Sequence, residues 1–377
     1  RRFVRTSTNS YDVVLVNLPP PSSLQLNRYY SLEFLKEVRH KMRPGAVIAF
    51  SLPASGEYVS RKAGLLNTVL LSTLKQCFSR VLILPAGRNY FLASDSALSL
   101  DIPGLVRTRG ISNVYVNEYY IDPVQLKERS EYITGFIKTT QPGPSALTKL
   151  VNRDFTPVAV WYQMSWWLSQ FQITQAVILF IFMIVLLVLM VTLNPLSAGL
   201  FAGGFTLASA EIILIFGMQI LCGYLCQAIG AIIMIFMLGL AVGSGIRFRP
   251  YWLCTLDFYR WLQLSLAFLA FMTPLVILWM GRSRTGDWLV NMVFALLAFS
   301  LAFIVGMEYR VAALLSDKTV QKTVAGNYSA EMFGSAAGAF AVTLFLIPAI
   351  GMTNTGIFLA AMNLCSAGSL FLLRRKS

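Results

Sequence analysis

Residues 173–193 read ITQAVILFIFMIVLLVLMVTL, and this stretch determines the class of the protein. All of it is apolar except Thr174, Gln175 and Thr192, and about twenty such residues let a helix cross the hydrocarbon core of a bilayer. The composition of the whole chain is also that of a membrane protein, because 56% of the 377 residues are hydrophobic. Only 13% are charged, against about 25% in soluble proteins. The sequence therefore predicts an integral membrane protein.

Further apolar runs follow this first span toward the C-terminus. The stretch 202–245 carries no charge apart from Glu211 and is long enough for two helices that reverse near Gly223 and Tyr224. Four more runs of about twenty residues follow. They cover residues 261–280, 288–307, 328–346 and 356–373. We therefore expect an all-α transmembrane bundle of about seven helices over residues 173–377.

Basic residues in the short loops predict the orientation, since Lys and Arg in such loops prefer the cytoplasm. One side of the predicted bundle carries Arg247, Arg249, Arg260, Arg310, Lys318, Lys322, Arg374, Arg375 and Lys376. The other side carries Arg282 and Arg284 in its short loops. The C-terminus is therefore expected in the cytoplasm. With seven spans the N-terminal part lies outside, in the periplasm of a bacterial inner membrane, and one span more or fewer would reverse its side.

Two carboxylates fall inside the predicted spans, Glu211 and Glu331. A carboxylate facing lipid is costly, so each is expected to face the bundle interior or a cavity, as in a cation or proton site. Two structural alternatives stay open: Glu331 lies at headgroup level, or Glu211 pairs with a donor on a neighbouring helix. Two small-xxx-small pairs predict close helix packing. They are Gly239 with Gly243, and Gly334 with Gly338.

The N-terminal part, residues 1–160, alternates short strands with helices. Residues 12–16 form a β-branched apolar run that suits a strand covered on both faces. Ser31 is a predicted N-cap for a helix over 32–42 that Pro44 and Gly45 end. A second helix is predicted over 65–78, and further strands over 47–51, 81–84 and 90–93. This order implies part of a parallel or mixed α/β sheet, and residues 161–172 form an amphipathic junction to the membrane region.

Several motifs in this part resemble a known family. Residues 11–21 read YDVVLVNLPPP, 26–30 read LNRYY, 51–53 read SLP and 90–94 read YFLAS. Together they resemble the C-terminal part of spermidine synthase domains, and more closely the branch fused to a multi-span, major-facilitator-like membrane region. The run NRDFTP at 152–157, with Trp166 and Trp167, is similar to the junction of that branch. Gly204-Phe205, Glu211 and FMLGL at 236–240 are similar to its span signatures. The resemblance covers nearly the whole chain.

The resemblance implies a Rossmann-like, methyltransferase-type fold that transfers an aminopropyl group from decarboxylated S-adenosylmethionine to putrescine. Active members carry two aspartates, three residues apart, at the strand end; one is the general base that deprotonates the attacking amine. Asn17 and Pro20 stand at the matching positions, so no catalytic residue is expected. Arg1-Arg2-Phe3-Val4 matches a segment that follows the family's glycine-rich nucleoside motif. We therefore expect no cofactor in this chain, with decarboxylated S-adenosylmethionine as the cofactor if it is active.

A vestigial substrate groove would be lined by a small set of polar and aromatic side chains, which buried packing explains equally well. The set is Asn17, Arg28, Tyr29, Tyr30 and Tyr90. A solvated helix and loop, or contact with a partner, would suit the mixed aromatic and charged segment 114–137. No basic run interleaves with aromatics, so nucleic acid is not an expected partner. The single histidine, His40, excludes any metal or catalytic scheme that needs two, and no metal is expected.

Three functions follow from these observations. The favoured one is a degenerate, catalytically inactive spermidine-synthase-like protein, anchored in membrane lipid, that acts as a scaffold or docking subunit for other protein subunits. The second is an active aminopropyltransferase that makes spermidine. The third is a polyamine or cation transporter that uses Glu211 and Glu331.

Overall fold

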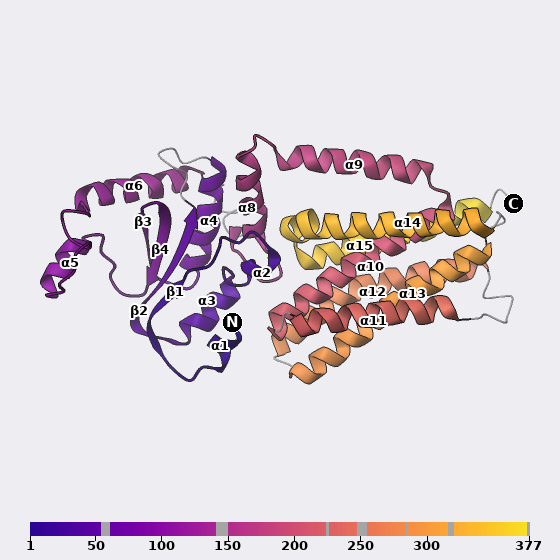
Figure 1. The fold of residues 1–377 in the computed structure, drawn as a ribbon, viewed down its shortest axis with the longest axis horizontal. Helices are drawn as coiled ribbons and strands as arrows, with labels where there is room; N and C mark the ends of the chain where they lie inside the picture. The colour runs from indigo at the N-terminus through magenta and orange to yellow at the C-terminus, as the bar shows by residue number, and fades with distance from the viewer. Residues whose placement is uncertain are drawn as a thin grey trace. The chain divides into compact units, whose positions relative to one another are not determined.

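A computed structural model describes residues 1–53, 61–140, 150–223, 226–246, 255–283, 286–315 and 320–374. The chain divides into two compact units, Arg1–Gln175 and Ala176–Ser377 (Figure 1). It is mostly helical and contains one small mixed sheet, which lies in the first unit. The predicted start of the membrane region, residue 173, lies close to this division.

The first unit is built on four strands, β1 (Tyr11–Val16), β2 (Met42–Pro53), β3 (Arg80–Pro85) and β4 (Arg88–Ser94). Its helices are α1 (Arg2–Thr6), α2 (Leu24–Asn27), α3 (Leu32–Arg39), α4 (Arg61–Lys75), α5 (Ile102–Thr108), α6 (Pro123–Thr140) and α8 (Val158–Ser169). The strand order is β1-β2-β4-β3. Strands β1 and β2 are parallel, and β4 is antiparallel to both of its neighbours. The sheet is therefore mixed, which the sequence left open.

One face of this sheet packs on α3, α4 and α6. Ser31 caps α3 by accepting a hydrogen bond from the Phe34 amide (3.3 Å), as its sequence predicts. Leu35 and Leu74 project from α3 and α4 into a core that also contains Ile48 of β2. The α4 helix begins four residues before the predicted 65–78 and ends three residues before its end.

The predicted end of α3 at Pro44 and Gly45 is wrong. The helix ends at Arg39, and both residues lie inside β2. The pairing of β1 with β2 shifts register there, and Gly45 has a φ of +82°, which favours glycine. Proline lacks an N–H for the ladder, so a bulge accommodates it in a strand. The Pro-Gly pair therefore bends a strand here and does not stop a helix.

The prediction that β1 is covered on both faces is also wrong. Val14 and Val16 face the core, whereas Val13 and Leu15 are 58% and 74% exposed. Successive side chains point to opposite faces of a strand, so the odd-numbered face of β1 is open. In the part of the chain that is described, no helix covers this apolar face.

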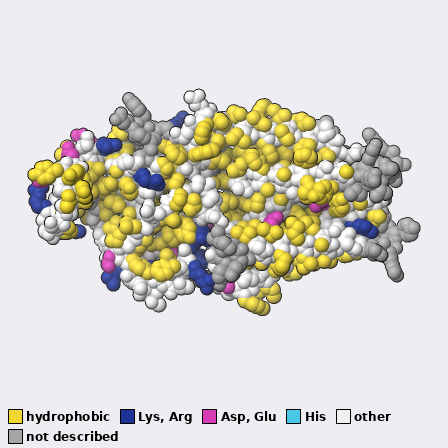
Figure 2. All heavy atoms as spheres, viewed as in Figure 1, with side chains coloured by type: hydrophobic (Ala, Val, Ile, Leu, Met, Phe, Trp, Pro, Cys, Tyr) yellow, Lys and Arg dark blue, Asp and Glu magenta, His cyan; other side chains and the backbone are white. Residues whose placement is uncertain are grey.

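All the secondary-structure elements described in the second unit are helices. Its elements are α9 (Gln175–Thr192), α10 (Pro195–Leu221), α11 (Cys226–Gly245), α12 (Leu256–Ser283), α13 (Asp287–Leu315), α14 (Val320–Ala341), the π-helical turn η3 (Val342–Leu346) and α15 (Ile347–Arg374). Apolar side chains cover most of its visible surface (Figure 2). Four stretches are long and apolar enough to cross a bilayer: Pro195–Leu221, Leu256–Ser283, Asp287–Leu315 and Ala325–Leu370. The expected integral membrane region is thus consistent with the structure, while seven spans are not confirmed.

Helix α10 is the most buried of these stretches and contacts α12, α13, α14 and α15. Both predicted small-residue pairs lie at close helix approaches. A Cβ on Gly334 or Gly338 would meet the carbonyl of Phe201 or Phe205 of α10 at 2.2 and 2.3 Å. Gly239 and Gly243 approach α13 in the same way. Close helix packing at these pairs is therefore confirmed.

Candidate functional site

The first candidate site is a groove of about 490 Å³ beside β1. Asn17, at the C-terminal end of the strand, is exposed and lines it together with Tyr29. Apolar side chains such as Val13 and Leu15 form most of its wall, and the two cationic lining residues are Arg1 and Lys41. No carboxylate lines it among the residues described. This groove therefore has neither a general base nor a negative charge that would attract an amine.

Tyr30, a predicted groove residue, lies in the core. It is 2% exposed and packs against Phe50 with ring centroids 5.6 Å apart. Its hydroxyl donates to the carbonyls of Pro19 (2.9 Å) and Leu18 (3.2 Å). Burial raises the pKa of Tyr30 to about 12, which the charge of Arg88 opposes in part, so the hydroxyl stays neutral and donates. Tyr30 thus fixes the loop that follows Asn17.

Of the remaining predicted groove residues, Arg28 and Tyr29 contact each other, and Tyr90 lies on another strand. Arg28 is buried, donates to the Tyr29 hydroxyl (2.8 Å) and lies over its ring (4.8 Å). Tyr29 packs edge-on against Phe34, with ring centroids 5.5 Å apart. Tyr90 lies on β4, is 39% exposed and does not line the groove. Of the five predicted residues, Asn17 and Tyr29 line this groove, and Pro20 does not.

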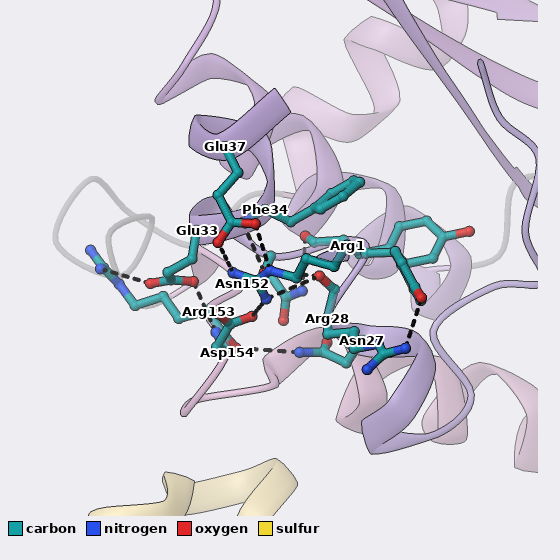
Figure 3. Close-up of polar contacts among 12 residues, drawn as sticks. Arg1, Asn27, Arg28, Glu33, Phe34, Glu37, Asn152, Arg153 and Asp154 are labelled. Carbon is teal, nitrogen blue, oxygen red and sulfur yellow. Dashed lines mark hydrogen bonds and ion pairs between the residues drawn. The ribbon is translucent and has the colours of Figure 1, made fainter. Parts of the chain in front are cut away.

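Arg1, which lines the groove, belongs to a network of partly buried charged side chains (Figure 3). Arg1 makes two hydrogen bonds to Glu37 (2.8 and 2.9 Å) and one to Asp154 (2.8 Å). Glu33 accepts a hydrogen bond from the Asp154 amide (2.9 Å). The side chains of Arg1 and Asp154 are 4% and 3% exposed. The carboxylates nearest the groove are therefore already committed to an arginine or a backbone amide.

Burial and pairing shift the pKa values of this network. Burial would raise the pKa of Glu37, but the hydrogen bonds from Arg1 and Arg5 outweigh it and lower that pKa below its usual 4.5. Burial, followed by the charge of Asp154, raises the pKa of Glu33. Residues 152–157 were predicted as a junction, and this network was not predicted. Asn152 fixes the segment beside the network, because its side chain donates to the Tyr30 carbonyl (2.9 Å) and accepts from the Ala159 amide (3.1 Å).

The second candidate site is a set of carboxylates in the helical unit. Glu211 of α10 is half-buried, and Glu331 of α14 is 7% exposed. Glu308 of α13, which the sequence analysis missed, is fully buried, and neither carboxylate oxygen has a hydrogen-bond partner among the residues described. The predicted span ended at Met307, one residue short of Glu308, because Arg310 resembled a loop residue. The 29-residue length of α13 places Glu308 inside the bundle.

A scan against protein-family models and a search of curated proteins each found no match. Among the residues described, no group of three or more His, Cys, Asp or Glu side chains comes together as a candidate metal site. The function therefore has to be argued from the groove, the surface and the bundle.

Proposed function

We propose that this chain is a degenerate, membrane-anchored spermidine-synthase-like protein without catalytic activity, whose N-terminal unit is a docking module of a membrane complex. The observation that carries this proposal is the groove beside Asn17. Its cationic residues, Arg1 and Lys41, would repel putrescine, and none of its described lining residues can deprotonate an amine. The buried network leaves neither Glu37 nor Asp154 to act as a substitute base.

The strand order supports a Rossmann-like, methyltransferase-type fold for the first unit. Helix α3 follows β1 and leads to its parallel neighbour β2, as in a βαβ unit. Strand β4 then lies antiparallel between β2 and β3, which run in one direction. The C-terminal half of a methyltransferase-type sheet, the fold that the resemblance implies, has this arrangement.

A docking role is supported by an exposed apolar patch, which we call the 111–124 patch. Its large side chains are Ile111, Val114, Tyr115, Val116, Tyr119, Tyr120 and Val124. Tyr119 is 89% exposed, and the rings of Tyr115 and Tyr120 meet edge-on at 5.7 Å. Tyrosine is enriched at protein interfaces, and contiguous exposed apolar patches mark interaction sites. Apolar side chains gather at the end of the unit where α5 lies (Figure 2).

For the second unit, we propose seven crossings of a bacterial inner membrane, with the C-terminus in the cytoplasm and the first unit in the periplasm. Ala325–Leu370 is 46 residues, or about 70 Å of helix, roughly twice the hydrocarbon thickness. Gly351 interrupts this stretch with a φ of +81°. Helices α14 and α15 both pack on the 27-residue α10, which one straight rod of that length could not do. This supports two crossings there, in addition to α9, α10, α11, α12 and α13.

Calorimetric titration of the purified full chain tests the absence of activity. We expect no binding of decarboxylated S-adenosylmethionine or putrescine, and no spermidine in a turnover assay. Binding accompanied by turnover would establish an active aminopropyltransferase and contradict the proposal.

Photo-crosslinking in native membranes tests the docking role. A photoreactive residue replaces Tyr119 in the patch, and a control replaces Asp12, whose side chain is 69% exposed on the same unit. We expect one discrete heavier adduct from position 119 and none from position 12. The double substitution Tyr115→Ser, Tyr120→Ser should abolish the adduct without unfolding, because both side chains are exposed. No adduct at 119, or equal adducts at both positions, would refute docking through this patch.

A further inference from the structure

Glu308 is a buried carboxylate without a counter-charge in the described part of the chain. It is 0% exposed, and both of its oxygens lack a hydrogen-bond partner. Arg260 does not supply the missing charge, because its guanidinium bonds to Asp257 (2.5 Å) and to the Leu370 carbonyl (2.6 Å). An ionised carboxylate held in a low-dielectric interior is costly unless a positive charge neutralises it.

Gln263 of α12 contacts α10 one helical turn before the glycine that Glu308 faces. Gln263 donates its amide N–H to the Gly199 carbonyl (2.9 Å), and its Oε1 has no partner in the described structure. In an α-helix the carbonyl of Gly199 accepts from the amide of Gly203. Glu308 Oε2 lies 2.5 Å from where a Cβ on Gly203 would be. Gln263 and Glu308 therefore contact residues of α10 that lie one helical turn apart.

The hydrogen bonds that the side-chain donors of this cluster make in the described structure go to backbone carbonyls of α10. The Tyr259 hydroxyl donates to the Leu196 carbonyl (3.2 Å), and the Gln263 amide donates to Gly199. The atoms left over are acceptors: both oxygens of Glu308 and Oε1 of Gln263. A proton on one Glu308 oxygen would provide a single donor. A cation bound by these oxygens would satisfy them and also neutralise the charge.

Two glycines of α10 provide the space that the Tyr259 and Glu308 side chains occupy. A Cβ on Gly199 would lie 2.3 Å from the Tyr259 hydroxyl, and one on Gly203 would overlap Glu308. The site is about 12 Å from the start of α10, counted from Pro195 at 1.5 Å per residue. It is therefore inside the bundle but within two to three turns of one end.

We propose that the two carboxylate oxygens of Glu308 and Oε1 of Gln263 bind one alkali metal cation in the interior of the helical unit, beside Tyr259. Hard cations take oxygen ligands, and the carboxylate and amide groups of this cluster supply oxygen atoms. A single carboxylate oxygen pair balances one positive charge, which favours a monovalent ion. The inference does not depend on the proposed function of the first unit.

Binding of radioactive ²²Na⁺ to the full chain in lipid nanodiscs is the direct test. We expect saturable binding of about one Na⁺ per chain that unlabelled Na⁺ displaces and choline does not. Thermal unfolding should shift upward in NaCl relative to choline chloride of equal ionic strength, because a ligand that binds only the folded state stabilises it. No saturable binding to the unmodified chain would overturn the proposal. So would a melting temperature that responds to pH but not to Na⁺, because Glu308 would then be neutralised by a proton.

Substitutions of the proposed ligands test which residues bind the cation. Glu308→Gln keeps the size of the side chain and should abolish Na⁺ binding, whereas Glu211→Gln, a half-buried carboxylate of the same bundle, should retain it. Gln263→Leu removes one oxygen ligand, keeps the charge and should weaken binding at least about tenfold, which provides a second test if Glu308→Gln fails to fold. Unchanged affinity in a folded Glu308→Gln or Gln263→Leu variant would contradict the assignment.

Discussion

Glu37 shows how a single residue holds two segments of the first unit together. It accepts hydrogen bonds from Arg1 and Arg5 (2.8 to 2.9 Å), and Arg1 in turn contacts Asp154, 117 residues further along the chain than Glu37. Breaking a buried ion pair leaves the remaining charge desolvated and unpaired, which costs more than the pair itself contributes. The network therefore stabilises the packing of α1 and the 152–157 segment on α3.

We predict that Glu37→Gln destabilises the first unit by about 2 kcal/mol at neutral pH. The folded pKa of Glu37 lies below its usual 4.5, so its stabilisation is fully present above about pH 4.5. It is lost as the pH falls through the folded pKa. The difference between the two proteins should therefore shrink in acid. The measurement is unfolding of the purified full chain, with hydrogen exchange of the α3 amides assigning the transition.

The matched control is Asp12→Asn, which breaks an exposed pair with Arg43 (2.9 Å). We expect a change of about 0.5 kcal/mol or less, because solvent screens such pairs. If Asp12→Asn lowered the free energy of unfolding as much as Glu37→Gln, the prediction would be contradicted. The difference in unfolding free energy between the unmodified protein and Glu37→Gln should not persist or grow down to about pH 3. Such a result would contradict the cause given for the pKa shift.

At the scale of elements, backbone contact between α10 and α14 organises the bundle. Glycine removes the side chain at the crossing, so the helices approach until backbone atoms touch. A Cβ on Gly338 would lie 2.3 Å from the Phe205 carbonyl oxygen, and one on Gly204 of α10 would lie 2.3 Å from the Glu331 carbonyl oxygen. Each helix thus places its glycines against the backbone of the other.

We predict that Gly338→Ala destabilises the helical unit by about 1–3 kcal/mol, since the added methyl meets backbone that cannot rotate away. Gly368→Ala is the matched control. A Cβ there meets nothing within 4 Å, and alanine is the better helix former by up to about 1 kcal/mol. Thermal unfolding in detergent micelles should separate the two variants in opposite directions. Equal melting temperatures for Gly338→Ala and Gly368→Ala would contradict the prediction, because the added methyl at position 338 would then not destabilise the contact between α10 and α14.

Local sequence patterns predicted the elements of this fold better than its contacts. The apolar run of β1 and the N-cap Ser31 were read correctly, because both signals lie within a few residues. Pro44 and Gly45 led to a wrong prediction, because a Pro-Gly pair can either end a helix or bend a strand. Which of the two occurs here depends on the pairing of β2 with β1, which is distant in the sequence. Glu308 was missed for a similar reason, because its burial depends on α10 and α12, which are distant in the sequence. Asn17 and Tyr29, both predicted groove residues, line one groove in the structure. Tyr30 was also predicted to line it, and only the contacts of its hydroxyl show that it belongs to the core.

At the scale of the whole molecule, the number of crossings determines which side of the membrane the first unit occupies. An odd number places residues 1–175 and the C-terminus on opposite sides, and an even number places them on the same side. Length and apolarity mark four stretches, with two shorter apolar stretches, Gln175–Leu189 and Ile229–Gly245. Seven crossings require both shorter stretches to span and Ala325–Leu370 to cross twice.

We predict that Tyr119→Cys is labelled by a membrane-impermeant maleimide in intact bacterial cells, while a fluorescent protein fused to the C-terminus folds and emits in the cytoplasm. Tyr119 is suited to this probe because it is 89% exposed, whereas the native Cys77 and Cys222 are buried. Cys365 is exposed but lies within the apolar stretch Ala325–Leu370, where a membrane-impermeant reagent has poor access. The unmodified chain is the control for background labelling. Labelling that appears only after lysis, with the fusion still fluorescent, would require an even number of crossings. The first unit would then lie in the cytoplasm, and the partner of the 111–124 patch would have to be sought there.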